Sequence, residues 1–238
     1  RSDYHLPYGQ DALIKKLLAV RPDMIVTMIA GSPFSMTEWI DQADTLLLSY
    51  YAGMETGRAF ANLLFGEVSP SGKLPTTYPK ELSDSPAHSI GQFGTSTNLS
   101  YAAFTYSDLQ VNAHPQESTD KLQSLDMLPA LYTVKLAVSN DSDINAKESV
   151  QLYIAAKDSK VKRPAKELRG FDKKEIAAHA KADYTFALTA EAFSYYEEEK
   201  HCYIAPAGTY EILLGSASDD IRLSQTVILS ADIMISRS

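Results

Sequence analysis

Residues 53–79 read GMETGRAFANLLFGEVSPSGKLPTTYP, and this stretch separates two different patterns of apolar residues. In its first half, apolar side chains recur at helical spacing, at Phe60, Leu63 and Leu64. Gly66 follows them in the position of a C-terminal cap. We therefore predict a helix over residues 55–65.

The second half of the stretch predicts a turn followed by a short strand. Pro70 and Gly72 occupy the second and fourth positions of a turn over residues 69–72. Residues 74–79 then read LPTTYP, where two prolines remove amide donors, so this segment can pair only at the edge of a sheet. We expect a parallel architecture to end here.

Upstream of this stretch, the pattern predicts alternating helices and strands. Residues 9–20 show the amphipathic pattern of a helix, and a shorter helical pattern covers residues 36–41. Residues 24–30 and 45–49 are runs of apolar residues, as expected of parallel strands that are buried on both faces. This order predicts an α/β layer structure with too few strands to close a sheet by itself.

From Ala103 onward the apolar residues alternate with a period of two, which indicates antiparallel strands. A sandwich of about seven strands accounts for this pattern. Because the chain has a single cysteine, we expect a fibronectin type III-like sandwich rather than one with the antibody cysteine pair. Turns are expected at residues 140–143, 169–170, 206–208 and 215–220. The side chains expected to face the core are Val134, Leu136, Val138, Val150, Leu152, Ile154, Tyr184, Phe186, Leu188, Tyr210, Ile212, Leu214, Leu223, Val227 and Leu229.

The composition of the 238 residues is typical of one or two ordinary globular domains, with 45% hydrophobic and 22% charged residues. A net charge of -8 argues against nucleic acid or an anionic membrane as a partner. No apolar run reaches the roughly 18 residues that a membrane helix needs. We interpret Cys202 as an ordinary thiol, and without a visible signal peptide the cytoplasm is the favoured location.

Few residues form a pattern that predicts chemistry. Ser32 follows a strand, where α/β sheets bind ligands, but no G-x-S-x-G motif surrounds it; a small α/β esterase is one alternative. Gly53 and Gly57 lack the lysine of a phosphate-binding loop, so close packing of a helix on a strand explains them better. We expect neither a metal nor a cofactor, because metal-ligand spacing is absent from the five histidines, His5, His88, His114, His179 and His201.

A carbohydrate-binding or adhesion module is the second alternative, since sugar-binding β-sandwiches expose aromatic rings. The only close aromatic cluster is formed by Tyr195, Tyr196 and Tyr203, and packing in the core explains it better. Sequons at Asn98 and Asn140 would matter only in a secreted eukaryotic protein.

Several blocks of the chain, in one order, resemble the C-terminal half of glycoside hydrolase family 3, which contains β-glucosidases and β-xylosidases. The blocks that resemble its α/β sandwich domain are residues 31–33 (GSP), 51–57 (YAGMETG) with Ala59, Ala61 and residues 64–66 (LFG), and 70–79 (PSGKLPTTYP). The blocks that resemble its fibronectin type III-like domain are residues 99–101 (LSY), 104–109 (FTYSDL), 150–153 (VQLY), 163–171 (RPAKELRGF) and 206–210 (PAGTY). The resemblance covers nearly the whole chain.

The resemblance implies hydrolysis of a terminal β-linked sugar with retention, by a nucleophilic and an acid/base carboxylate about 5 Å apart. In the family, the nucleophilic Asp belongs to an N-terminal barrel domain that this chain lacks. The acid/base Glu belongs to an E-G-x-D-R segment. Arg1, followed by Leu6 and Pro7, resembles the end of that segment, which would place the Glu a few residues before Arg1. We therefore expect no catalytic residue in the chain, no activity of the chain alone, and Arg1 next to the sugar pocket. The expected partners are the N-terminal barrel part of the same protein and a β-linked glucoside, with a homo-oligomer left open.

The resemblance also implies a domain organisation. Residues 1–92 should be part of the α/β sandwich domain, residues 93–102 a junction, and residues 103–238 the fibronectin type III-like domain. The family carries a tyrosine-rich segment of the V-G-Y-R-Y kind near this junction, and the chain lacks it. Either a natural deletion has occurred or residues are missing from the sequence there. We expect missing residues, and ordinary Cα separations of about 3.8 Å at every step over residues 92–104 would contradict this.

Overall fold

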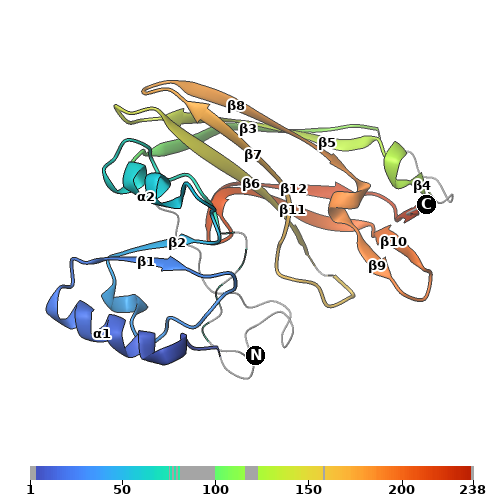
Figure 1. Ribbon diagram of the computed structural model, residues 1–238. Coiled ribbons are helices and arrows are strands. Elements are labelled where there is room, and N and C mark those ends of the chain that lie inside the picture. The colour runs from blue at the N-terminus through green and yellow to red at the C-terminus, as the bar shows by residue number, and fades with distance from the viewer. Residues whose placement is uncertain are drawn as a thin grey trace. The chain divides into compact units, whose positions relative to one another are not determined.

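We describe the chain from a computed structural model (Figure 1), which covers residues 4–74, 76, 78, 80, 100–115, 123–157 and 159–236. These residues divide into two compact units. The α/β unit contains the residues up to Val68 and again from Leu74 to residue 80, and the sandwich unit contains Ser69–Lys73 and residues 100–236. Among the described residues, no helix has both the length and the apolar character needed to cross a membrane.

The α/β unit follows the predicted order of helices and strands. Strands β1 and β2 pair in parallel, with Ile25 opposite Thr45, which confirms both predicted strands. The predicted helices over residues 9–20 and 55–65 are present, whereas the helical pattern over residues 36–41 ends in a single 3₁₀ turn. The elements are η1 (Pro7–Gly9), α1 (Gln10–Val20), β1 (Ile25–Ile29), η2 (Ile40–Gln42), β2 (Thr45–Ser49) and α2 (Thr56–Leu64).

The core of the α/β unit is organised around Trp39, which is fully buried. Its indole nitrogen donates a hydrogen bond of 2.8 Å to Oδ1 of Asp11, and the other carboxylate oxygen of Asp11 accepts a bond from the backbone nitrogen of Leu6. Asp11 is itself buried in the first turn of α1. This carboxylate therefore ties the start of the helix to the loop that carries the tryptophan.

The expectation that β1 is buried on both faces is wrong for this chain. Val26 is buried against α1, but Ile25 and Ile29 on the opposite face are 47% and 61% exposed. The outer side of α1 is apolar as well, with Leu13, Leu17 and Val20 exposed. Helix α1 covers one face of the two-stranded sheet; on the other face the described side chains of β1 are largely exposed, whereas those of β2 are half-buried.

Helix α2 begins at a loop that requires a glycine. Gly53 has a φ of +80°, and its carbonyl accepts a bond of 2.6 Å from the hydroxyl of Thr56. Gly66, with a φ of +78°, ends the helix as predicted. By contrast, a methyl group added at Gly57 would meet no atom within 4 Å, so the prediction of close helix–strand packing at this glycine is wrong.

The predicted turn and edge strand after α2 are not found where the chain is described. Residues 69–74 form neither a turn nor a strand, and Thr76 and Tyr78 also lie outside any strand. Proline has no backbone N–H to donate, which agrees with the absence of ladder bonds at the described residues of this stretch. Pro75, Thr77 and Pro79 lie outside the described residues, as do residues 93–99 of the predicted junction.

The sandwich unit contains two main antiparallel sheets (Figure 1). The first has three strands in the order β3–β5–β8: β3 (Phe104–Ala113), β5 (Ala130–Asn140) and β8 (Lys181–Thr189). The second has four strands in the order β12–β11–β6–β7: β12 (Asp220–Leu229), β11 (Gly208–Ala217), β6 (Ala146–Ala156) and β7 (Glu167–Ile176). Together they confirm the predicted sandwich, with seven strands in the described residues.

The core of the sandwich lies where the alternating pattern predicted it. The predicted inward side chains of β5, β6, β8 and β11 are all buried, and Leu223 of β12 is partly buried against them. The prediction of a turn at Arg169 and Gly170 is wrong, because both lie inside β7. Gly170 faces Leu152 across the sheet, and a side chain there would lie 3.3 Å from the ring of Phe186. The glycine thus serves close packing between the sheets.

A third, smaller sheet was not predicted. Its order is β4–β13–β10–β9, and its strands are β4 (Gln123–Ser124), β13 (Ile233–Ser236), β10 (Cys202–Ala205) and β9 (Tyr195–Glu197). Two short 3₁₀ helices, η4 (Leu125–Met127) and η5 (Ala190–Phe193), accompany it. Strands of two to four residues are too short to show a period of two, which is why the sequence pattern missed them.

The Asp11–Trp39 bond leads to a first prediction. Asp11→Ala should lower the free energy of unfolding of the α/β unit by about 1–3 kcal/mol, because it leaves a buried indole N–H unsatisfied. Trp39 is the chain's one tryptophan, so its fluorescence during urea unfolding reports this unit. The matched control is Asp23→Ala, which removes an exposed partner of Arg21 and should change stability by less than about 0.5 kcal/mol. Equal effects of the two changes would contradict the role of Asp11.

The two glycines at α2 lead to a second prediction. Gly53→Ala should destabilise the α/β unit by about 1 kcal/mol, because alanine resists a positive φ. Gly57→Ala should instead stabilise it by up to about 1 kcal/mol, because alanine favours a helix and meets no neighbour. Thermal unfolding followed by Trp39 fluorescence compares them. The different roles given to Gly53 and Gly57 are contradicted if both changes shift the thermal unfolding midpoint in the same direction.

Candidate functional site

The carboxyl edge of the β1–β2 sheet is where an open α/β sheet binds ligands. Here it consists of the loop after β1, with Gly31 and Ser32, and the loop after β2, with Tyr50, Tyr51 and Met54. Tyr51 is 81% exposed, and Met54 is fully exposed. A side chain at Gly31 would come within 2.4 Å of the Tyr51 ring, so the glycine allows this ring to lie across the edge.

The carboxyl edge lacks the two facing carboxylates of a glycosidase in the described residues. Glu55, just beyond the edge, is exposed and forms an ion pair of 3.2 Å with Arg58 on α2. Tyr50 contacts Tyr78, whose hydroxyl lies 3.4 Å from its own, and burial raises the pKa of Tyr78 above its ordinary value. These groups can contact a ligand but do not form an acid–base pair.

Arg1, the one residue that we expected next to a sugar pocket, lies outside the described residues. Ser32 is exposed in the bend after β1. His5, the histidine nearest to it in sequence, lies 3.9 Å from both the Asp11 and the Glu38 carboxylate. These contacts of His5 give the esterase alternative no further support.

The described histidines are dispersed over the two units. His114 contacts Thr133, and His179 contacts Asp143, each at 2.7 Å and at an exposed position. His88 is not among the described residues. Where the chain is described, no group of three or more His, Cys, Asp or Glu side chains could hold a metal ion.

The three tyrosines proposed as a sugar platform are only partly brought together. Tyr196 of β9 and Tyr203 of β10 are opposite each other, with ring centroids 5.2 Å apart in an edge-to-face arrangement. Tyr203 packs against the sandwich core, and Tyr196 is 49% exposed. Tyr195 alternates to the other face and donates a hydrogen bond of 3.0 Å to Glu197. This arrangement does not present a flat aromatic surface.

The sequon at Asn140 is part of the fold. Asn140 is 1% exposed, and its amide donates hydrogen bonds to the carbonyls of Ile144 and Ile176. A buried amide with two acceptors is not accessible to glycosylation in the folded protein. Asn98, the other sequon, lies outside the described residues.

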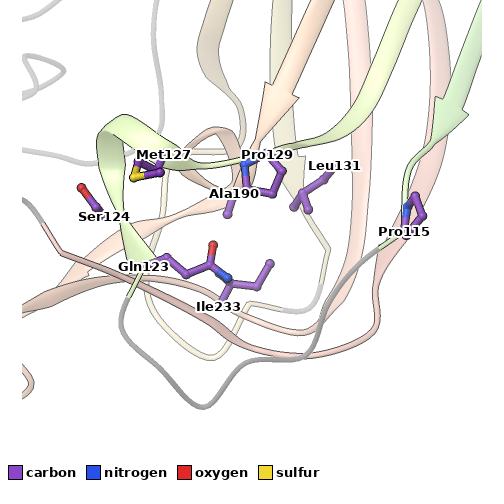
Figure 2. A pocket seen from close by; sticks show the side chains of 8 residues that line it. All are labelled: Pro115, Gln123, Ser124, Met127, Pro129, Leu131, Ala190 and Ile233. Carbon is purple, nitrogen blue, oxygen red and sulfur yellow. The ribbon is translucent and has the colours of Figure 1, made fainter.

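Figure 2 shows a groove at the end of the sandwich unit that holds the third sheet, with a volume of about 440 Å³. Sequence reasoning did not find it, because its residues come from distant segments. They are mostly apolar and include no acid or base: Pro115, Gln123, Ser124, Met127, Pro129, Leu131, Ala190 and Ile233. The lining can contact an apolar group but offers no hydrolytic chemistry.

A buried ionic cluster in the sandwich unit, formed by Glu148, Lys73 and Tyr106, was not predicted from the sequence. Glu148 occupies an inward position of β6 and pairs with Lys73, which lies 75 positions earlier in the sequence. Burial lowers the pKa of Lys73, an effect that the Glu148 carboxylate opposes, and burial beside Glu148 raises the pKa of Tyr106. The signal in the sequence was a glutamate two residues before Val150, Leu152 and Ile154, in phase with these core residues.

Comparisons with known protein families found one matching family model in each part of the chain. The family model described as "Glycosyl hydrolase family 3 C-terminal domain" matches residues 1–119, and the model of a "Fibronectin type III-like domain" matches residues 148–218. These matches confirm the predicted resemblance and the fold class of an α/β domain followed by a β-sandwich.

Similar proteins include thermostable beta-glucosidase B of Acetivibrio thermocellus, 32% identical over 99% of this chain and 33% of its own length. Beta-glucosidase BoGH3A of Bacteroides ovatus is 28% identical over 93% of this chain and 32% of its own length. Among solved structures, a GH3 beta-glucosidase of Bifidobacterium adolescentis matches with a TM-score of 0.81 and 30% identity, covering 96% of this chain and 36% of its own.

The chain therefore spans about a third of the length of the curated relatives that it matches. Its match to the family model extends over half of its residues, and its similarity to the relatives extends over nearly all of them. The chain belongs to glycoside hydrolase family 3 and corresponds to the C-terminal part of the family's β-glucosidase-like proteins.

Proposed function

We propose that the chain is the C-terminal portion of a retaining β-glucosidase and that it acts as scaffold rather than as the source of catalytic groups. The observation that carries this proposal is the similarity, over nearly the whole chain, to proteins named beta-glucosidases. The substrate class is a terminal β-linked glucoside. Both catalytic carboxylates are supplied by residues outside this sequence.

The exposed apolar surface of the α/β unit supports a partner within the same protein. Ile25 and Ile29 lie on the uncovered face of β1, and Leu13, Leu17 and Val20 lie on the outer side of α1. Full burial of each such side chain stabilises a protein by about 1.5–3 kcal/mol. An N-terminal barrel part, with the remaining strands of the α/β domain, is the partner that we assign to this surface.

In this proposal, the carboxyl edge contributes to one wall of the sugar site. The nucleophile attacks the anomeric carbon, and the acid/base group protonates the leaving oxygen and later activates water. The acid/base Glu precedes Arg1 in this assignment, so Arg1 lies near the pocket. The proposed domains are residues 1–92, a junction at 93–102, and residues 103–238.

Turnover of an aryl β-glucoside tests this assignment. The 238-residue chain alone should show none, because it lacks both carboxylates. A chimera in which the chain replaces the C-terminal third of the Acetivibrio thermocellus enzyme should be active and release β-glucose first, as followed by NMR. The control is that enzyme truncated by the same third, which should be inactive.

Each outcome bears on one part of the proposal. Turnover by the chain alone would contradict the location of the carboxylates. Release of α-glucose first would contradict the retaining mechanism. A chimera that is folded by circular dichroism, yet inactive, would contradict the scaffold role.

A further inference from the structure

The interior of the sandwich contains a carboxylate, and this requires an explanation. Glu148 is in phase with Val150 and Leu152 on β6 and is 3% exposed. A buried carboxylate is strongly destabilising unless hydrogen bonds and a positive charge compensate for its lost hydration. The groups that compensate the Glu148 carboxylate show which parts of the chain cover this end of the sandwich.

One compensating group comes from the sandwich itself. The hydroxyl of Tyr106, on β3, donates a hydrogen bond of 2.8 Å to Oε1 of Glu148. Arg222 lies 4.8 Å from the centre of the Tyr106 ring and forms an ion pair with Asp220, so its charge is already compensated. The hydroxyl of Tyr184 donates to the backbone carbonyl of Glu148, not to its carboxylate.

The positive charge comes from a distant part of the sequence. Nζ of Lys73 lies 3.4 and 3.5 Å from the two carboxylate oxygens of Glu148, and the Lys73 side chain is 13% exposed. The two residues are 75 positions apart. Lys73 is the end of Ser69–Lys73, a segment that packs with the sandwich although the residues on both sides of it belong to the α/β unit.

The rest of this segment is attached to the sandwich as well. Ser69 is buried; its hydroxyl lies 3.2 Å from that of Ser100 and accepts a bond of 3.1 Å from the backbone nitrogen of Tyr101. The carbonyl of Ser71 accepts a bond of 2.8 Å from Nζ of Lys173 on β7. The segment is therefore held at three points, at its beginning, its middle and its end.

We propose that Ser69–Lys73 is a clasp, a loop of the α/β chain that closes the sandwich by placing Lys73 on Glu148. The sandwich is then a discontinuous fold, complete only when this upstream loop is in place. Without the clasp, β3 and β6 separate more easily at the Glu148 end, because a buried carboxylate has lost its counterion. This role is independent of any glycosidase activity.

Substitutions in the full 238-residue chain test the clasp. Lys73→Met should lower the unfolding midpoint of the sandwich by about 5–10 °C, because it leaves Glu148 buried and unpaired. Hydrogen exchange measured by mass spectrometry should become faster in β3 and β6. The matched control is Lys147→Met, next to Glu148 but 55% exposed and paired with Glu175 at the surface, which should shift the midpoint by less than about 2 °C.

The double variant Lys73→Met/Glu148→Met keeps the test decisive if the single variant folds poorly. It removes both charges together, so it should lose clearly less stability than the sum of the losses from Lys73→Met and Glu148→Met. Trp39 fluorescence shows separately whether the α/β unit is folded in each variant. The proposal is overturned if Lys73→Met behaves like Lys147→Met, or if the two single losses simply add.

Discussion

A two-stranded parallel sheet with one helix on it cannot bury both of its faces, and this constraint determines what the α/β unit can be. Val26 is buried beneath α1, whereas Ile25 and Ile29 face outward. Parallel strands occur almost always in sheets that are covered on both sides. The unit therefore has the architecture of one part of a larger layer structure, in agreement with its membership of a family whose matched relatives are about three times as long.

The sandwich unit buries its core with its own strands and so depends less on other parts of the protein than the α/β unit does. The exception is Glu148. Its inner side chains form a continuous core between two sheets, and Gly170 permits their close approach. A carboxylate at one end of this core makes the fold sensitive to the segment that supplies Lys73. The segment Ser69–Lys73 is then part of the sandwich, although the α/β unit flanks it in the sequence on both sides.

Much of the fold could be predicted from periodicity, because alternation at Val150, Leu152 and Ile154 reports burial directly. Tertiary effects account for the errors. The turn predicted at Gly170 is wrong because a glycine that serves close packing has the same local signal as a turn glycine. The Lys73–Glu148 pair joins residues 75 positions apart, which no local pattern reports. The carboxyl edge was predictable from strand order, but the exposure of Tyr51 was not.

In the function that we propose, the catalytic carboxylates belong to the same protein but lie outside this sequence. The most direct test is the intact mass of the protein purified from its natural source. We expect a mass well above the 26.2 kDa of the 238 residues, with β-glucosidase activity in the same species. A natural protein of 26.2 kDa that hydrolyses β-glucosides would contradict it.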